Sequence, residues 1–175
     1  MALNKIKTVL LLVPVAVLSL TGCGVSVKYS FSGASIDPGV KTVSVQYFQN
    51  RASIVNPTLS QDITDALTDK CKSQTKLKIV TSDGDVSFEG YITDYKAVPF
   101  TATTATSQTA TNRFTISIKV KFVNNVNPDN NFEQTFSRYV DYESGVNFSS
   151  VEQEYSKEII DQLVDDIFNK AFANW

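Results

Sequence analysis

The segment that decides the fold is residues 113–123, RFTISIKVKFV, in which polar and apolar residues alternate from Arg113 to Phe122. Strict alternation over this length predicts a β-strand with one buried face. The opposite, polar face carries three cations, Arg113, Lys119 and Lys121. The chain is therefore expected to form a sheet with one apolar and one polar face. The side chains expected on the apolar face are Phe114, Ile116, Ile118, Val120 and Phe122.

Further strands flank this segment in the sequence. Residues 86–95 and 132–142 alternate in the same way, and shorter strands are predicted at 25–31, 40–48 and 77–81. In residues 40–48 the side chains expected to share one face are Val43, Val45 and Tyr47. In residues 132–142 the corresponding face is expected to carry Phe132, Gln134, Phe136, Arg138, Val140 and Tyr142.

Turn signals separate these strands. Asp37-Pro38-Gly39 and the run 124–131 are typical of turns, and Asp83-Gly84 could close a hairpin between 77–81 and 86–95. Residues 101–112, TATTATSQTATN, contain no bulky core residue, and this composition predicts a mobile loop.

Two segments have helical periodicity. In the first, Asn56-Pro57 is a good helix start with Asn as the N-cap, and Leu59, Ile63, Leu67 and Cys71 recur every four residues up to about Lys72.

The second helix is expected to begin near Ser149, which forms a capping-box pattern with Glu152. Its apolar stripe is broad, which suits packing against a sheet. The fold class is therefore α+β, with one mostly antiparallel β-sheet and two α-helices packed on one face. The stripe carries Tyr155, Ile159, Ile160, Leu163, Val164, Ile167, Phe168, Ala171 and Phe172.

The start of the chain is typical of a secretory signal. Lys5 and Lys7 precede an apolar run, 8–20, that is shorter than the roughly 20 residues needed to span a bilayer. The run ends in Leu20-Thr21-Gly22-Cys23, which looks like the lipobox of bacterial lipoproteins. The alternative is an ordinary signal peptide with an incidental cysteine. The lipobox implies that residues 1–22 are removed and that Cys23 becomes the lipidated first residue. The remaining residues, 23–175, have the length of one domain. Gly24, where an Asp would signal retention in the inner membrane, favours the outer membrane.

Composition argues against several functions. Removing the two lysines of the signal leaves a mature formal charge of −4, so we expect no nucleic-acid partner. The chain has no histidine, which removes the usual general base and the commonest metal ligand. Ser73, near Lys76, is expected to be solvated, as are Asp161 and Asp165. We therefore expect no enzymatic activity, no cofactor and no metal.

Cys71 is the only cysteine that remains after Cys23. It lies in the apolar series of the first helix, which predicts a buried and inert thiol. An intermolecular disulfide is the alternative, because secreted proteins meet an oxidising environment.

The cations of segment 113–123 form a candidate binding surface. Arg113, Lys119 and Lys121 lie on one side of the strand, and guanidinium and ammonium groups suit phosphate. Arg138 joins them if the next strand presents it on the same face. The more conservative interpretation is an ordinary solvated sheet surface, and the sharper hypothesis is contact with the phosphates of an anionic glycolipid.

The mature chain resembles the LptE family, the lipoproteins of lipopolysaccharide assembly, in the form seen in Bacteroidota. The resemblance covers nearly all of residues 23–175 and includes no catalytic motif. The stretches that carry it are TGCGVSVKYSFSGASI, SVQYFQNRASIVNPTLSQDITDALTDK, GDVSFEGYITDY, NRFTISIKVKFVN, FEQTFSRYVDY and SSVEQEYSKEIIDQLVDDIFNKAFANW.

This resemblance implies a partner and a place. The partner would be an LptD-like outer-membrane barrel protein, which the chain would plug and help to fold while contacting lipopolysaccharide. The chain would be attached to the outer membrane by its lipid anchor, on the periplasmic side or inside the barrel lumen. A stand-alone periplasmic lipoprotein that binds a lipid or another hydrophobic ligand is the alternative function. The lipopolysaccharide role of Arg113, Lys119 and Lys121 comes from strand alternation and not from the family.

Overall fold

The computed structural model describes residues 36–104 and 107–173. The predicted strand 25–31, the signal 1–22, and Cys23 all lie outside these residues. The described part contains one sheet and two long helices, α2 (Leu59–Gln74) and α3 (Phe148–Phe172). Its strands are β1 (Thr42–Val45), β2 (Gln49–Asn50), β3 (Lys78–Val80), β4 (Val86–Thr104), β5 (Ser107–Asn124) and β6 (Phe132–Glu143), with a short 3-10 helix, η1 (Pro128–Asn130), before β6.

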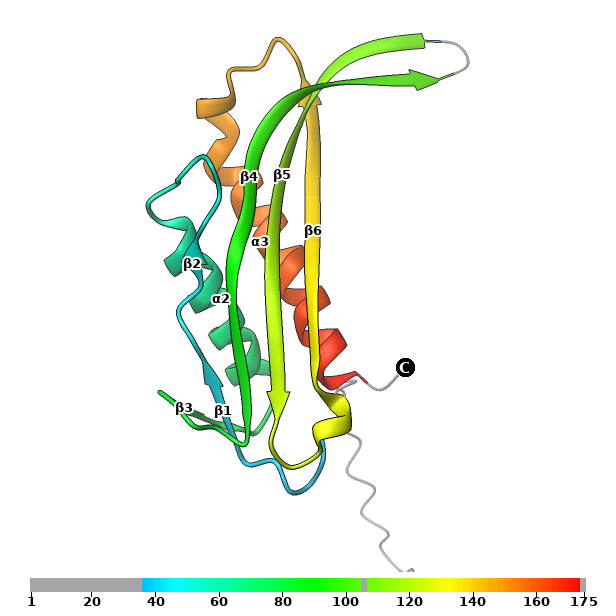
Figure 1. Ribbon diagram of the computed structural model, residues 1–175. Coiled ribbons are helices and arrows are strands. Elements are labelled where there is room, and N and C mark those ends of the chain that lie inside the picture. Colours follow the sequence, from blue (N-terminus) through cyan, green and yellow to red (C-terminus); the bar gives the residue numbers. More distant parts are fainter. Residues whose placement is uncertain (1–35, 105–106, 174–175) are drawn as a thin grey trace, which may run out of the picture. The chain divides into compact units, whose positions relative to one another are not determined.

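The sheet has the strand order β3-β1-β4-β5-β6, and β2 pairs with β4. Strands β4, β5 and β6 form an antiparallel meander, whereas β1 runs parallel to both β3 and β4. Both helices lie on the same side of the sheet, as Figure 1 shows. The predicted α+β class, with a mostly antiparallel sheet and two helices on one face, is confirmed.

The apolar face of β5 is the centre of the core. All five side chains expected to be inward are buried, and the side chains of α3 pack against them. The ring of Phe122 lies 4.9 Å from that of Phe88 on β4 and 5.8 Å from that of Phe172 on α3, measured between centroids. Burying such large apolar surfaces is the main favourable contribution to folding.

The helices carry the expected apolar rows but begin differently. Helix α2 begins at Leu59 with Thr58 as its N-cap, so the prediction of Asn56 as the N-cap is wrong. The Asn56 side chain accepts a hydrogen bond from the Thr58 N–H at 3.0 Å, just before the helix. Helix α3 is capped by Asn147, whose side chain accepts from the Ser149 N–H at 3.1 Å. The predicted Ser149–Glu152 capping box is therefore wrong. The Glu152 carboxylate is instead used by Tyr95 and Asn56, which both donate hydrogen bonds to it.

The hairpin expected between 77–81 and 86–95 is also wrong. Strand β1 lies between β3 and β4, in register with Ile79 on one side and Val86 on the other, both opposite Val43. The connecting loop passes against β1, since a Cβ on Gly84 would lie 2.7 Å from the Ser44 nitrogen. The sequence marks the turn but not the strand that the loop must cross.

Asp85 fastens this loop to β1. Its carboxylate accepts hydrogen bonds from the Lys41 N–H at 2.8 Å, and from the Thr42 hydroxyl and N–H at 2.9 Å each. These donors hold the pKa of Asp85 below its ordinary value, the Lys41 N–H most strongly. The loop between β3 and β4 is therefore anchored by a charge that persists at neutral pH.

The predicted strand 40–48 is interrupted. Strand β1 ends at Val45, Tyr47 is 55% exposed and Phe48 is fully buried, so the expectation that Tyr47 shares a face with Val43 is wrong. Phe48 enters the core beside Gly90, where a Cβ would lie 2.7 Å from the Phe48 ring. The absent side chain at position 90 makes room for the ring.

Residues 101–104 and 107–112 are strand, so the predicted loop is wrong over these residues. The β4–β5 ladder continues from Phe100 opposite Thr111 to Thr104 opposite Ser107. Figure 1 shows these two strands extending past the end of β6. Threonine is β-branched and favours extended backbone, so a paired hairpin can form there without bulky core residues.

Leu163 tests how far the fold depends on α3, because it is fully buried at the centre of the apolar stripe. Leu163→Ala should lower the free energy of unfolding by about 2–5 kcal/mol through lost burial and a residual cavity. Chemical denaturation measures this change. Gln153→Ala, at an exposed position of the same helix, is the matched control and should be nearly neutral. An unchanged midpoint for Leu163→Ala would show that α3 does not hold the core.

Candidate functional site

The outer face of the sheet, which is turned away from the helices, holds all three cations expected from the sequence. Arg113, Lys119 and Lys121 alternate with the buried residues of β5 and are partly exposed. The strand face predicted for them is therefore correct. Arg138 does not join them, since it lies opposite the buried Ile116 and its guanidinium donates two hydrogen bonds to Asp166 of α3.

Each of the three cations of β5 has an acidic partner on a neighbouring strand. Lys119 Nζ lies 2.6 Å from a carboxylate oxygen of Glu133 on β6, and Lys121 Nζ lies 3.5 Å from one of Glu89 on β4. The Lys119–Glu133 hydrogen bond raises the pKa of Lys119 and lowers that of Glu133. The pair is therefore charged at neutral pH, and an anionic ligand has to compete with Glu133 for the ammonium group.

Arg113 is the most firmly held of the three. Its Nε and one terminal nitrogen donate to the two oxygens of Asp141 at 2.7 and 2.8 Å, a bidentate pair. Its guanidinium also lies between the rings of Phe100 and Tyr139, 3.7 Å from each centroid. The bond to Asp141 raises the pKa of Arg113 and lowers that of Asp141. Stacking and pairing together orient the guanidinium.

A hollow of about 600 Å³ lies on this face around Lys119 and Lys121. The sequence analysis did not identify its other wall, which comes from the segment where β1 stops and β2 begins. There the Arg51 guanidinium lies 4.2 Å from the Tyr91 ring centroid. No local pattern signals this wall, because it forms only where the chain departs from alternation. The lining residues are Gln46, Tyr47, Gln49, Arg51, Glu89, Gly90, Tyr91, Lys119, Lys121 and Glu133.

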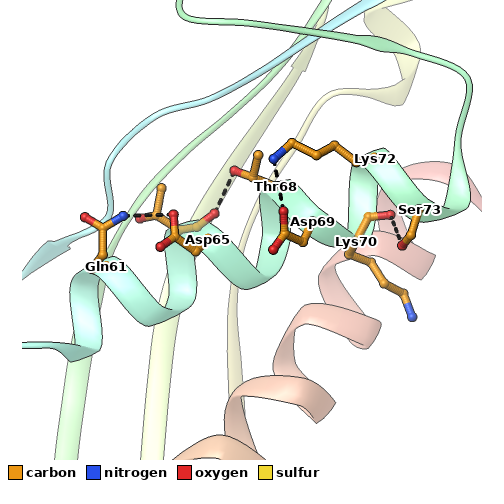
Figure 2. Close-up of polar contacts among 8 residues, drawn as sticks. Gln61, Asp65, Thr68, Asp69, Lys70, Lys72 and Ser73 are labelled. Atoms are coloured by element: carbon orange, nitrogen blue, oxygen red, sulfur yellow. Dashed lines mark hydrogen bonds and ion pairs between the residues drawn. The ribbon is translucent and has the colours of Figure 1, made fainter.

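The other candidate reactive groups are structural or solvated. The Ser73 hydroxyl donates to the Lys70 carbonyl of its own helix, as Figure 2 shows, and Lys70 pairs with Asp165 at 2.6 Å. Asp161 pairs with Lys157 in the same helix. Over residues 36–104 and 107–173, no cluster of three or more potential metal-ligating side chains is found.

Cys71 is fully buried in α2, and burial raises the pKa of its thiol to about 12. A thiol in this state is neutral at physiological pH and is a poor nucleophile. The prediction of a buried thiol is confirmed.

A family model for LptE, described as lipopolysaccharide-assembly, matches residues 40–171. This range contains every strand of the described sheet and all but the last residue of α3. The chain belongs to the LptE family. LptE proteins are non-enzymatic lipoproteins of lipopolysaccharide assembly that are associated with the outer membrane, and family membership supports that role for this chain.

Solved structures resemble this LptE-family chain in fold. A hypothetical protein from Chlamydia trachomatis is 9% identical, with a TM-score of 0.52 over 77% of this chain and 99% of that one. A minor lipoprotein from Acinetobacter baumannii is 11% identical, with a TM-score of 0.49 over 75% of this chain and 91% of that one. At this level of identity, the Chlamydia structure supports the fold alone. The comparison with curated proteins gives no match.

The described helices of this LptE-family protein are too short or too polar to cross a bilayer. The longest, α3, carries charged side chains along its exposed side, including Lys157, Asp161 and Asp165.

Proposed function

We propose that this protein partners an LptD-like outer-membrane barrel as its plug and assembly factor, and so takes part in the transport of lipopolysaccharide and its insertion into the outer membrane. The observation that carries the proposal is the LptE match over residues 40–171, which covers nearly all of the described domain. A family match that extends over a whole domain suits a protein that acts through its surfaces.

The outer sheet face supports a protein–protein role. Lys119, Lys121 and Arg113 each have a carboxylate within ion-pairing distance on an adjacent strand. Burying an unpaired charge is strongly unfavourable, whereas a charge that keeps its partner costs much less to desolvate. Such a face can be covered by a polar barrel lumen and still keep its charges compensated.

The proposed anchor is Cys23, lipidated after removal of residues 1–22. Two or more acyl chains give stable membrane attachment. Between Cys23 and Ile36, the first described residue, a fully extended chain spans at most about 45 Å. The anchor therefore keeps the domain close to the outer membrane, on the periplasmic side or inside the barrel lumen.

We further propose that Arg113, Lys119 and Lys121 contact lipopolysaccharide phosphates. A phosphate has more negative charge than a carboxylate and can accept bonds from more than one cation. Lys119 and Lys121 flank one hollow, so a phosphate placed there can exchange with Glu133 and Glu89. Arg113 must release its bidentate bond to Asp141, and we expect its contribution to be the smallest of the three.

The proposed partnership is tested by solubilising the full-length lipoprotein from outer membranes in mild detergent. It should co-purify with a large barrel protein that mass spectrometry identifies as LptD-like. Recovery of the lipoprotein alone with a small bound lipid would contradict the proposal and favour the stand-alone carrier.

The proposed anchor is tested by Cys23→Ala. Without a thiol to receive the lipid, the variant should accumulate as an uncleaved precursor or as a soluble protein. Intact-mass measurement of the wild-type protein should show a cleaved and acylated Cys23. An unmodified Cys23 at the mature N-terminus would rule out the anchor.

The phosphate contact is tested with a triple variant, Arg113→Gln, Lys119→Gln and Lys121→Gln. It should bind purified lipopolysaccharide at least several-fold more weakly than wild type at low salt, and high salt should weaken the wild type in the same direction. The matched control removes the same charge from three exposed lysines outside the sheet, with Lys72→Gln, Lys76→Gln and Lys157→Gln.

The ion pairs give a second arm to this test. Glu133→Gln removes the carboxylate that competes for Lys119, so it should strengthen lipopolysaccharide binding. Equal binding by the wild type and the Arg113/Lys119/Lys121 variant at low salt would exclude the proposed contact.

A further inference from the structure

Strand β6 forms one edge of the sheet. It pairs with β5 along its whole length, from Phe132 opposite Phe122 to Glu143 opposite Thr111, without a register shift. Within the described residues no strand pairs with its other side. An edge of this kind presents a row of backbone N–H and C=O groups to any strand that approaches.

The hydrogen bonds at the ends of β5 and β6 identify the groups that face outward. The Ser144 N–H donates to the Ala110 carbonyl at 3.4 Å, and the Asn124 N–H points to the β6 side, where it donates to the Asn131 side chain at 2.6 Å. Bonded and non-bonded pairs alternate along an antiparallel ladder. The even-numbered residues of β6 therefore bond to β5. The residues whose backbone groups face the open side are Glu133, Thr135, Ser137, Tyr139 and Asp141.

The backbone of this edge has none of the features that block strand pairing, and charged side chains are its only protection among the described residues. Proline, a β-bulge or a very short strand normally prevents unwanted pairing. On the side away from β5, strand β4 has no paired strand after Ile92, where β2 ends, among the described residues. There β4 contains a register shift between Ile92 and Asp94, and Pro99 follows further along. Strand β6 has neither feature, and the backbone-presenting residues Thr135 and Ser137 are exposed.

The side chains of the edge define what can dock there. On the outer face, β6 carries three carboxylates, Glu133, Asp141 and Glu143, and no cation. Lys119 pairs with Oε1 of Glu133, so the second oxygen of that carboxylate has no ion-pair partner among the described residues. Glu143 forms no ion pair with any described residue. Opposite charges across neighbouring strands stabilise pairing. An incoming strand with lysine or arginine on this face is therefore favoured.

A second copy of the chain fits this edge poorly. Two antiparallel pairings of β6 with a second β6 align nearly all of the strand and place outer-face side chains next to outer-face side chains. Both pairings bring like charges together. In one, Glu133 faces Asp141. In the other, Glu133 faces Glu143 and Arg138 faces its own copy. Like charges directly opposite are destabilising.

We propose that β6 is a docking edge for an extended segment of another polypeptide, one that carries lysine or arginine at alternate positions and adds to the sheet as a further strand. Main-chain hydrogen bonds would provide the affinity and the carboxylates the selectivity. The inference concerns the open edge of β6, which shares only Glu133 with the hollow of Lys119 and Lys121, and it does not require the barrel partner.

The test uses the full-length mature lipoprotein in detergent and a fluorescent peptide of about ten residues that alternates lysine and valine. The peptide should bind the wild type, as measured by fluorescence anisotropy. Thr135→Pro removes an outward N–H and no bond to β5, so it should weaken binding at least tenfold. Thr135→Ala keeps the N–H and should bind as the wild type does. A peptide of equal charge with proline in place of valine should not bind, because it cannot form the ladder.

Hydrogen exchange provides a readout that does not depend on the variant's stability. In the wild type, the peptide should slow exchange of the Thr135 and Ser137 amides and leave the Gln134 amide, which already bonds to β5, unchanged. Equal peptide binding by wild type and a folded Thr135→Pro would overturn the proposal. Protection from exchange confined to another strand would also overturn it. A wild-type dimer that Thr135→Pro converts to monomer would overturn it too, because a second copy of the chain would then occupy the edge.

Discussion

The inner face of β5 is the surface on which the rest of the structure depends. Its five apolar side chains are buried beneath the helices, between partners on β4 and β6, so the strand's position fixes the register of both neighbours. The aromatic contacts among Phe88, Phe122 and Phe172 then hold the C-terminal end of α3 against the sheet. A one-residue shift of β5 would expose the whole apolar row, so this register is strongly specified.

The same alternation produces the polar face. Because side chains of β5 point alternately to the two faces, burial of one row places Arg113, Lys119 and Lys121 together on the other. Their partners come from both neighbouring strands: Asp141 and Glu133 on β6 and Glu89 on β4. The result is a surface of compensated charges and not a uniformly positive one. This surface is compatible with contact to a protein, and an anionic ligand would have to displace a carboxylate to reach a cation.

The meander and the β1–β3 region differ in how they are built. Strands β4 to β6 follow one another in space as in sequence, whereas β3 lies beyond β1 and is joined to β4 by a loop that crosses β1. The contacts of Asp85 with Lys41 and Thr42 secure that crossing. A second polar cluster joins Asn56, Tyr95 and Glu152, and so connects the start of α2, strand β4 and α3. These polar clusters hold the connecting segments in one position, which apolar packing alone does not specify because it is non-directional.

The sequence by itself determined the faces of the long elements, since periods of two and of about 3.6 residues are local properties of the backbone. The apolar face of β5, the rows of α2 and α3, and the α+β class all follow from them, as does the resemblance to LptE. Only the tertiary structure decided that β1 separates β3 from β4, that Phe48 and not Tyr47 enters the core, and that the polar run before Arg113 is strand. It also decided the ion-pair partner of each cation. The physical reason is that pairing and register depend on residues distant in sequence, which no local period can report.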